Sequence, residues 1–80
     1  MAEIITSAQL RAARALLDWS MIDLAKVARV SVSTIKRLED ERLRPATARS
    51  TASVQGAFET AGVRFLADDG DGPGVRCKLG

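Results

Sequence analysis

The sequence has no histidine and no tyrosine, and its only cysteine is Cys77. Without histidine it cannot form a histidine-based metal site or use histidine in catalysis, and one cysteine forms neither an internal disulfide nor a CxxC zinc motif. No histidine is present to activate Cys77 as a nucleophile, and no glycine-rich phosphate loop follows a strand. These absences predict a protein that is not an enzyme and that uses no cofactor and no metal.

Long apolar runs are also missing. No stretch approaches the roughly 18 apolar residues of a membrane span, and the N-terminus does not resemble a signal peptide, so we expect a cytoplasmic protein that does not enter a membrane. Asp69 and Asp71 have the D-x-D-G spacing of a calcium loop, but the rest of an EF-hand loop is absent, including its distal glutamate. We interpret these aspartates, together with Asp68, as a solvated turn.

Basic side chains concentrate in the middle of the chain. The 80 residues are enough for one domain, and their formal net charge is only +2. Between Lys26 and Arg49, seven basic residues stand against three acidic ones, a local net charge of +4. Neutralisation of nucleic-acid phosphates requires such a surface, although an ordinary solvated surface has the same composition.

Residues 20–39 have the pattern of two short helices joined by a tight turn. Ser20, followed by Asp23, and Ser31 are placed as N-caps of the two helices. The apolar positions of the stretch are Leu24, Ala25, Ala28, Val30, Ile35 and Leu38. Because Ala25 is small, the second helix can cross the first closely, which predicts a helix-turn-helix. The polar side of the second helix carries hydroxyl groups and then cations, which suits a helix that enters a DNA major groove.

Helical patterns also flank this motif. The T-x-x-Q pattern at residues 6–9 is a capping box, and the helix that begins there should end near Asp18. Another helix is expected to begin at Thr47 or Ser50 and to end near Ala61. The sequence therefore predicts four helices in total.

The C-terminal residues change to the pattern of a β-hairpin. Residues 63–67 and 75–79 both alternate, and turn-forming residues separate them. One face of the hairpin consists of Val63, Phe65, Val75, Cys77 and Leu79. A lone hairpin is marginal in water, so this face must pack on the helices or against a second copy. Because an exposed edge strand invites pairing, we expect these five residues to form a dimer interface, with the fourth helix as the alternative.

Several small and apolar positions of the motif agree in register with those of a known family: Leu24-Ala25, Val30-Ser31, Ser33-Thr34-Ile35 and Leu38-Glu39. On these residues the chain resembles the lambda-repressor/Cro-like (Xre-type) helix-turn-helix family. The resemblance implies a mainly α fold, with a four-helix lambda-repressor-like DNA-binding domain in residues 1–62, and we expect the C-terminal β-hairpin in residues 63–80. Two positions depart from the family pattern, Met21 in place of glutamine and Arg29 in place of a turn glycine.

The resemblance implies a sequence-specific DNA-binding transcriptional regulator. We expect a repressor that acts as a homodimer on a palindromic operator, with a recognition helix at about residues 31–41 in the major groove and two such helices about 34 Å apart. Val32, Ser33 and Arg37 are expected to read bases, through a thymine methyl, a base edge and guanine respectively. The expected phosphate contacts are Ser31, Thr34, Lys36, Arg29, Arg42 and Arg44, with helix support as the alternative role of Thr34.

The resemblance also pairs Arg14 with Glu39 as a structural ion pair between the first helix and the recognition helix. An alternative function remains open, that of a protein-interaction module such as an antitoxin or antiactivator on the same scaffold. The departures at Met21 and Arg29 keep this alternative open. In the family an amide at the first of these positions contacts the DNA backbone, and a glycine at the second fits the turn. The expected partners are double-stranded DNA, a second copy of the chain, and a protein such as polymerase or another regulator.

Overall fold

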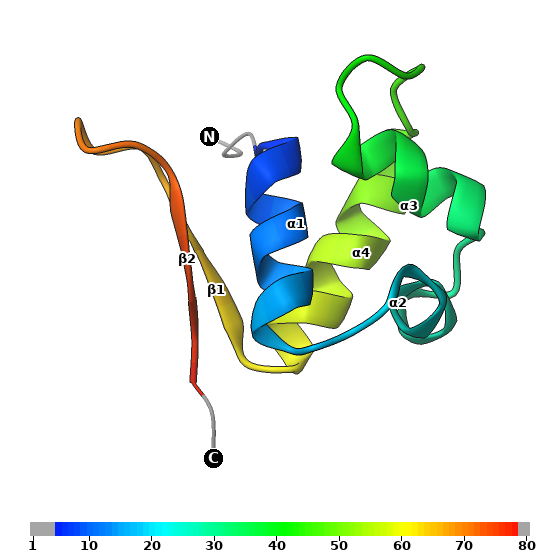
Figure 1. Cartoon of the computed structure of the whole chain (residues 1–80), viewed down its shortest axis with the longest axis horizontal. Coiled ribbons are helices and arrows are strands. Elements are labelled where there is room, and N and C mark those ends of the chain that lie inside the picture. The colour runs from blue at the N-terminus through cyan, green and yellow to red at the C-terminus, as the bar shows by residue number, and fades with distance from the viewer. Residues whose placement is uncertain (1–4, 79–80) are drawn as a thin grey trace.

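Four helices and a two-stranded antiparallel sheet follow one another along residues 5–78, which the computed structural model describes (Figure 1). The helices are α1 (Ser7–Leu16), α2 (Met21–Ala28), α3 (Val32–Glu39) and α4 (Ala48–Thr60), and the strands are β1 (Val63–Leu66) and β2 (Gly74–Cys77). The mainly α fold with a C-terminal hairpin is confirmed. None of the described helices is long and apolar enough to cross a membrane.

Each helix begins next to a side chain that accepts a hydrogen bond from the backbone three residues later. The predicted capping box is present, because Thr6 Oγ1 accepts from the Gln9 N–H at 3.1 Å and Gln9 Oε1 accepts from the Thr6 N–H at 2.9 Å. Ser20 and Asp23 make a second capping box, with distances of 3.0 and 2.9 Å. Of the two caps expected for α4, Thr47 is the one that accepts the backbone bond.

The helices and the hairpin share one hydrophobic core. Its buried residues are Leu10, Ala13, Leu24, Ala25, Ala28, Ile35, Val54, Phe58 and Val63. Trp19 stacks on Phe58 with 5.8 Å between ring centroids, and Phe65 meets Phe58 edge-on at 5.9 Å. These three rings join the segment before α2, helix α4 and strand β1. The expected boundary after residue 62 falls between the helices and the strands. Side chains from both sides of this boundary contribute to the same core.

The apolar face of the hairpin is directed at the chain's own helices. Val63 pairs with Cys77 and Phe65 with Val75 in the antiparallel register. Val63 is 3% exposed, and Phe65, Val75 and Cys77 pack against the core. These four residues, which are expected at a dimer interface, therefore pack against helices of their own chain, and their contact with a second copy stays a prediction. Leu79, the fifth residue assigned to that interface, lies outside the described residues.

A buried glutamine fastens the hairpin to α1. Gln9 is 5% exposed, and its Nε2 donates to the Leu66 carbonyl at 3.0 Å and to the Gly74 carbonyl at 2.9 Å. Because one acceptor lies on each strand, this single side chain holds both strands against the helix. The sequence predicts the capping role of Gln9 but not this second one.

Helix α3 is shorter than the predicted residues 31–41. Ser31 remains outside the helix as its N-cap, and Asp40 leaves the helical conformation with φ −136° and ψ 104°. The Asp40 carboxylate accepts a hydrogen bond from the Arg42 N–H at 3.0 Å, which stabilises a turn immediately after the helix. Helix α1 likewise ends at Leu16, two residues before the predicted end at Asp18.

Candidate nucleic-acid interface

Helices α2 and α3 form a close helix-turn-helix pair. Ala25 and Ala28, each 7% exposed, lie in the core with Ile35 of α3, so the two helices approach without large side chains between them. Arg29 ends α2 in the left-handed conformation, with φ 59° and ψ 45°, and its N–H donates to the Ala25 carbonyl. The N–H of Val30 donates to the same carbonyl at 3.1 Å. The chain therefore turns sharply at Arg29, and α3 begins three residues later.

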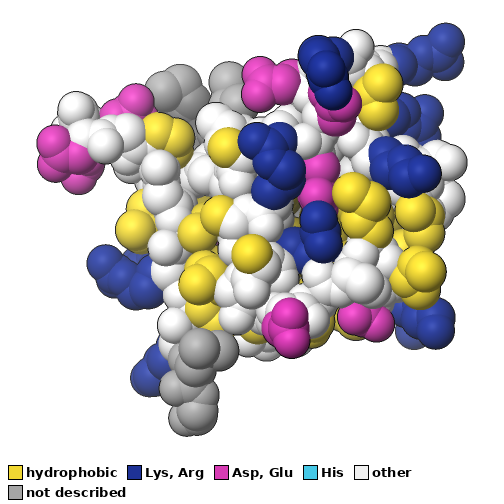
Figure 2. Space-filling model, viewed as in Figure 1, with side chains coloured by type: hydrophobic (Ala, Val, Ile, Leu, Met, Phe, Trp, Pro, Cys, Tyr) yellow, Lys and Arg dark blue, Asp and Glu magenta, His cyan; other side chains and the backbone are white. Residues whose placement is uncertain are grey.

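The side of α3 that faces away from the core carries polar groups. Ser33 and Lys36 are exposed, Val32 and Arg37 are partly exposed, and Thr34 is buried. Figure 2 shows Lys and Arg side chains gathered on the right of the molecule, over α2, α3 and the loop after α3 as placed in Figure 1. Among the three predicted base readers, Ser33 is thus the most accessible.

Thr34 links two of the predicted DNA contacts. Arg37 Nη2 donates to Thr34 Oγ1 at 3.2 Å, and Thr34 Oγ1 lies 2.9 Å from Ser31 Oγ. Ser31 Oγ also accepts the N-cap bond from the Thr34 N–H at 3.1 Å. The hydroxyl and the N–H of Thr34 are therefore already bonded to groups within the helix-turn-helix. Arg37 Nε is buried and has no hydrogen-bond partner within residues 5–78. The bond to Thr34, three residues earlier, holds the guanidinium along its own helix.

Arg14 of α1 and Glu39 of α3, the pair that the resemblance implies, are in contact. Arg14 Nε donates to Oε2 of Glu39 at 2.8 Å and Nη2 donates to Oε1 at 3.0 Å, a bidentate geometry. The hydrogen bond to Glu39 raises the pKa of Arg14. Arg14 Nη1 also donates to the Trp19 carbonyl at 3.1 Å, and Arg11 donates to the Glu39 carbonyl. The recognition helix is therefore tied at its C-terminal end to α1.

The loop after α3 extends the basic surface. Arg42 and Arg44 are both exposed, but Arg42 pairs with Asp40, with Nη2 to Oδ2 at 2.9 Å and Nε to Oδ1 at 3.0 Å. The hydrogen bonds from the Arg42 side chain and backbone lower the pKa of Asp40 to about 2, and the same pair raises the pKa of Arg42. Arg42 is thus held beside the end of α3.

A cleft of about 950 Å³ lies between α1, the start of α2 and the end of α3. Charged side chains of both signs line it, including Arg11, Lys36 and Glu41, so it offers no purely cationic or anionic pocket for a small ligand. No group of three or more histidine, cysteine, aspartate or glutamate side chains that could hold a metal ion occurs in the described part of the chain.

A family model described as helix-turn-helix matches residues 10–49, half of the chain. The chain belongs to the lambda-repressor/Cro-like (Xre-type) helix-turn-helix family. The match begins inside α1, includes α2 and α3 and reaches the start of α4, so it covers Arg14, Glu39 and the exposed face of α3. No curated protein matches the sequence. Membership of this family makes the protein a DNA-binding helix-turn-helix regulator.

In this lambda-repressor/Cro-like chain, Arg29 occupies a backbone conformation that favours glycine. At φ 59°, a non-glycine residue costs about 1 kcal/mol. Arg29→Gly is expected to raise the unfolding temperature by up to about 4–8 °C, a typical gain for 1 kcal/mol in so small a domain. Scanning calorimetry measures the change, and Arg29→Asn is the control, since asparagine tolerates this backbone without carrying a charge. A lower unfolding temperature for both variants would show that contacts of the arginine side chain outweigh the strain.

The lambda-repressor/Cro-like domain is also expected to lose a favourable interaction in acid. Because Asp40 has a pKa of about 2 in the folded chain against an ordinary 3.8, its pairing stabilises the fold above pH 3.8 and is lost as the pH falls toward 2. An NMR titration of the carboxyl carbon should therefore give a midpoint near 2. Arg42→Ala should return that midpoint toward 3.8, and an unchanged midpoint would contradict the role of Arg42.

Proposed function

We propose that the protein is a transcriptional repressor of the cytoplasm that binds a palindromic operator as a homodimer, without enzymatic activity. The observation that carries this proposal is the polar face of α3, where Ser33 and Lys36 are exposed while Ile35 of the same helix is fully buried. A helix fixed in this way presents its polar side chains to a major groove without unfolding any part of the core. A bound domain represses most simply by occluding the promoter from polymerase.

Three side chains of α3 are proposed to read bases. Val32 contacts a thymine methyl, Ser33 bonds to a base edge, and Arg37 donates to O6 and N7 of guanine. Arg37 must leave Thr34 Oγ1 to do so, and its unpartnered Nε supports this movement, because the resting position leaves a buried donor unsatisfied.

Ser31 is proposed to donate a hydrogen bond to a phosphate. The guanidinium of Arg37 can only donate, so Thr34 Oγ1 accepts from it, and either hydroxyl can donate in the contact between Thr34 Oγ1 and Ser31 Oγ. When Thr34 is the donor, Ser31 Oγ accepts from both the hydroxyl and the N–H of Thr34. Its own hydrogen remains available to an acceptor outside the protein, whereas Thr34 acts as helix support.

The remaining phosphate contacts are assigned to exposed cations on either side of α3: Arg29, Lys36, Arg42 and Arg44. Arg42 is already paired with Asp40, but its side chain is 88% exposed. Exposed ion pairs are weak because water and salt screen both charges, so a phosphate can compete with the Asp40 carboxylate for Arg42.

A salt titration combined with footprinting tests this function. The probe is a duplex selected from a randomised pool, compared with random duplex of equal length. Binding should weaken by roughly 0.9 log units of affinity per log unit of salt for each neutralised phosphate. Lys36→Ala should weaken binding to both duplexes equally and reduce the salt slope by about one.

The competing function is a protein-interaction module, such as an antitoxin or antiactivator. Met21 favours it, since the thioether at the start of α2 offers only a weak acceptor where the family has an amide. Selection without enrichment, together with no protected footprint at low salt, would support this module and reject the repressor.

A further inference from the structure

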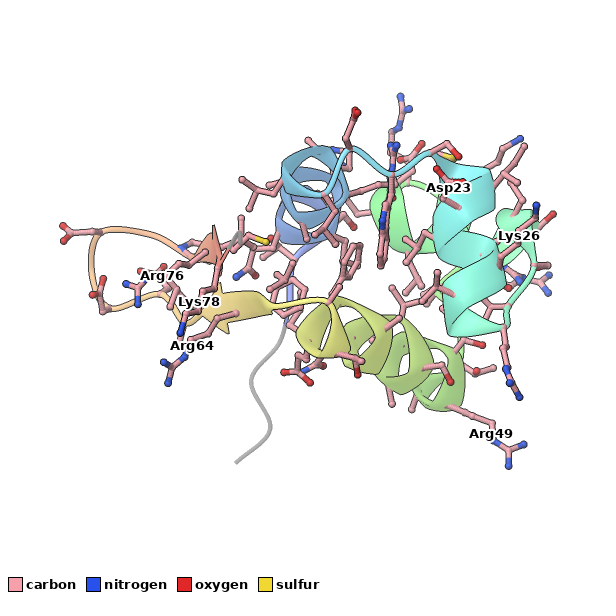
Figure 3. The ribbon with its side chains drawn as sticks, turned by 90° about the horizontal axis from the view of Figure 1, so that it is seen from below. Asp23, Lys26, Arg49, Arg64, Arg76 and Lys78 are labelled. Atoms are coloured by element: carbon pink, nitrogen blue, oxygen red, sulfur yellow. The ribbon has the colours of Figure 1, made fainter. Side chains whose placement is uncertain are left out.

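The hairpin has a second face, which none of the helices in residues 5–78 covers. Since side chains alternate across a strand, Arg64 and Leu66 of β1 and Arg76 of β2 lie on the side opposite the buried apolar face. Lys78 continues this outer face beyond β2, and its N–H donates to the Gly62 carbonyl at 3.1 Å. Figure 3 shows Arg64, Arg76 and Lys78 grouped on one side of the hairpin. The outer face therefore carries its positive charge at the base of the hairpin, which is the end opposite the turn.

These cations repel one another and have no acidic partner within the described residues. Arg64 and Arg76 lie directly opposite each other in the register of the strands, and like charges at such positions are destabilising. The ion pairs of residues 5–78 are Arg14–Glu39 and Arg42–Asp40, and neither involves the hairpin. An anionic group from outside the chain would relieve this repulsion.

The turn of the same hairpin carries the opposite charge. Asp68, Asp69 and Asp71 are exposed, and Oδ1 of Asp68 accepts from the N–H groups of Gly70 and Gly72 at 3.0 and 2.9 Å. Figure 2 shows acidic side chains at the tip of the hairpin and basic ones below them. About 13 Å of extended chain separates the Cα atoms of Arg64 and Asp68. Within the described residues, no ion pair joins the carboxylates of the turn to Arg64, Arg76 or Lys78, so both clusters can still pair with charges of another copy.

We propose that a second copy of the chain covers this outer face, with the two hairpins stacked antiparallel about a two-fold axis. Each acidic turn then lies over Arg64, Arg76 and Lys78 of the other copy, and the symmetry forms the contact twice. Leu66 lies between the two charged clusters and pairs with Gly74, where an added Cβ would lie 3.8 Å from Cδ1 of Leu66. The two Leu66 side chains meet near the axis, and the charged groups surround them.

This inference names the surface of the proposed homodimer and uses residues that the proposed DNA contacts do not. Its test is the oligomeric state without DNA, by sedimentation velocity at low and high salt. Arg64→Glu/Arg76→Glu makes the end of the hairpin opposite the turn acidic. Asp69→Lys/Asp71→Lys makes the turn basic; Asp68 keeps its bonds to Gly70 and Gly72, and the bond from the Asp71 N–H to Asp69 Oδ1 is lost. Each variant alone should self-associate at least about tenfold more weakly than the unaltered chain, because like charges then face each other. A mixture of the two variants should form a heterodimer.

Lys26→Glu/Arg49→Glu is the matched control, since it makes the same charge change at exposed sites far from the hairpin (Figure 3). It should dimerise as the unaltered chain does. A monomeric unaltered chain, full dimerisation of either hairpin variant, or no heterodimer in the mixture would each overturn the proposed surface. DNA binding by the same variants is measured separately by footprinting. A failure of the dimer surface can therefore be distinguished from a failure of DNA binding.

Discussion

Arg14→Ala is expected to lower the free energy of unfolding by about 3 kcal/mol, since it leaves the buried carboxylate of Glu39 without its cation. The side chain of Glu39 is 3% exposed and that of Arg14 is 24% exposed, so the loss should lie near the lower end for buried pairs. In a domain of this size it corresponds to a fall in unfolding temperature of roughly 12–24 °C. Thermal and denaturant unfolding, followed by circular dichroism, measure it.

The double variant Arg14→Ala/Glu39→Gln separates the charge effect from the lost packing. An amide at residue 39 removes the uncompensated charge, so this variant should unfold at a higher temperature than Arg14→Ala alone. Arg49→Ala is the control for removal of an exposed arginine and should change stability by less than about 0.5 kcal/mol. If Arg14→Ala were no more destabilising than Arg49→Ala, the pair would contribute nothing to the connection between α1 and α3.

The helix-turn-helix could be predicted from sequence because its determinants are local. The caps of α1, α2 and α3 each involve residues three positions apart, and the apolar residues of each helix recur at a helical period. The ends of the helices were less predictable. The end of α3 at Glu39 depends on the turn that Asp40 and Arg42 make, and the pattern of apolar residues carries no sign of it.

The alternation of side chains along the hairpin strands predicts its two faces but not what each face contacts. Alternation correctly places Val63, Phe65, Val75 and Cys77 on one face, but it does not say whether that face meets the same chain or another copy. Gln9 helps to hold this face against the chain's own helices. Its side chain donates to the carbonyl groups of Leu66 and Gly74, which lie 57 and 65 positions farther along the chain. A side chain already assigned to a capping box gives no local sign of a second partner.

The side-chain arrangement of the candidate interface was likewise not predictable. The position and charge of Arg37 predict base reading, yet its guanidinium is hydrogen-bonded to Thr34 in the free protein. The Arg14–Glu39 pair came from the family resemblance, because its members are 25 residues apart and only the packing of α1 on α3 brings them together. Sequence thus predicts which groups are available, whereas packing decides which of them are already bonded.

Arg37→Ala is expected to weaken binding to a selected operator by about 1–3 kcal/mol, or roughly 5- to 150-fold, and to relax preference at one base pair. In the free protein Arg37 makes one bond to a neutral hydroxyl and leaves Nε buried without a partner. Guanine offers two acceptors in a plane that matches the guanidinium, so the exchange favours the bound state. Competition binding on duplexes that differ at single positions measures both effects.

Arg37→Lys is the informative control, because it retains the charge but replaces the planar forked guanidinium with a flexible ammonium. If Arg37 reads guanine, the lysine variant should lose part of the preference at that base pair while its affinity for random DNA stays close to that of the unaltered chain. Lys36→Ala, by contrast, should weaken binding to operator and random DNA alike, because a phosphate carries no sequence information. Equal losses on both kinds of DNA for Arg37→Ala would reassign Arg37 to the phosphates and leave Val32 and Ser33 as the base-reading residues of α3.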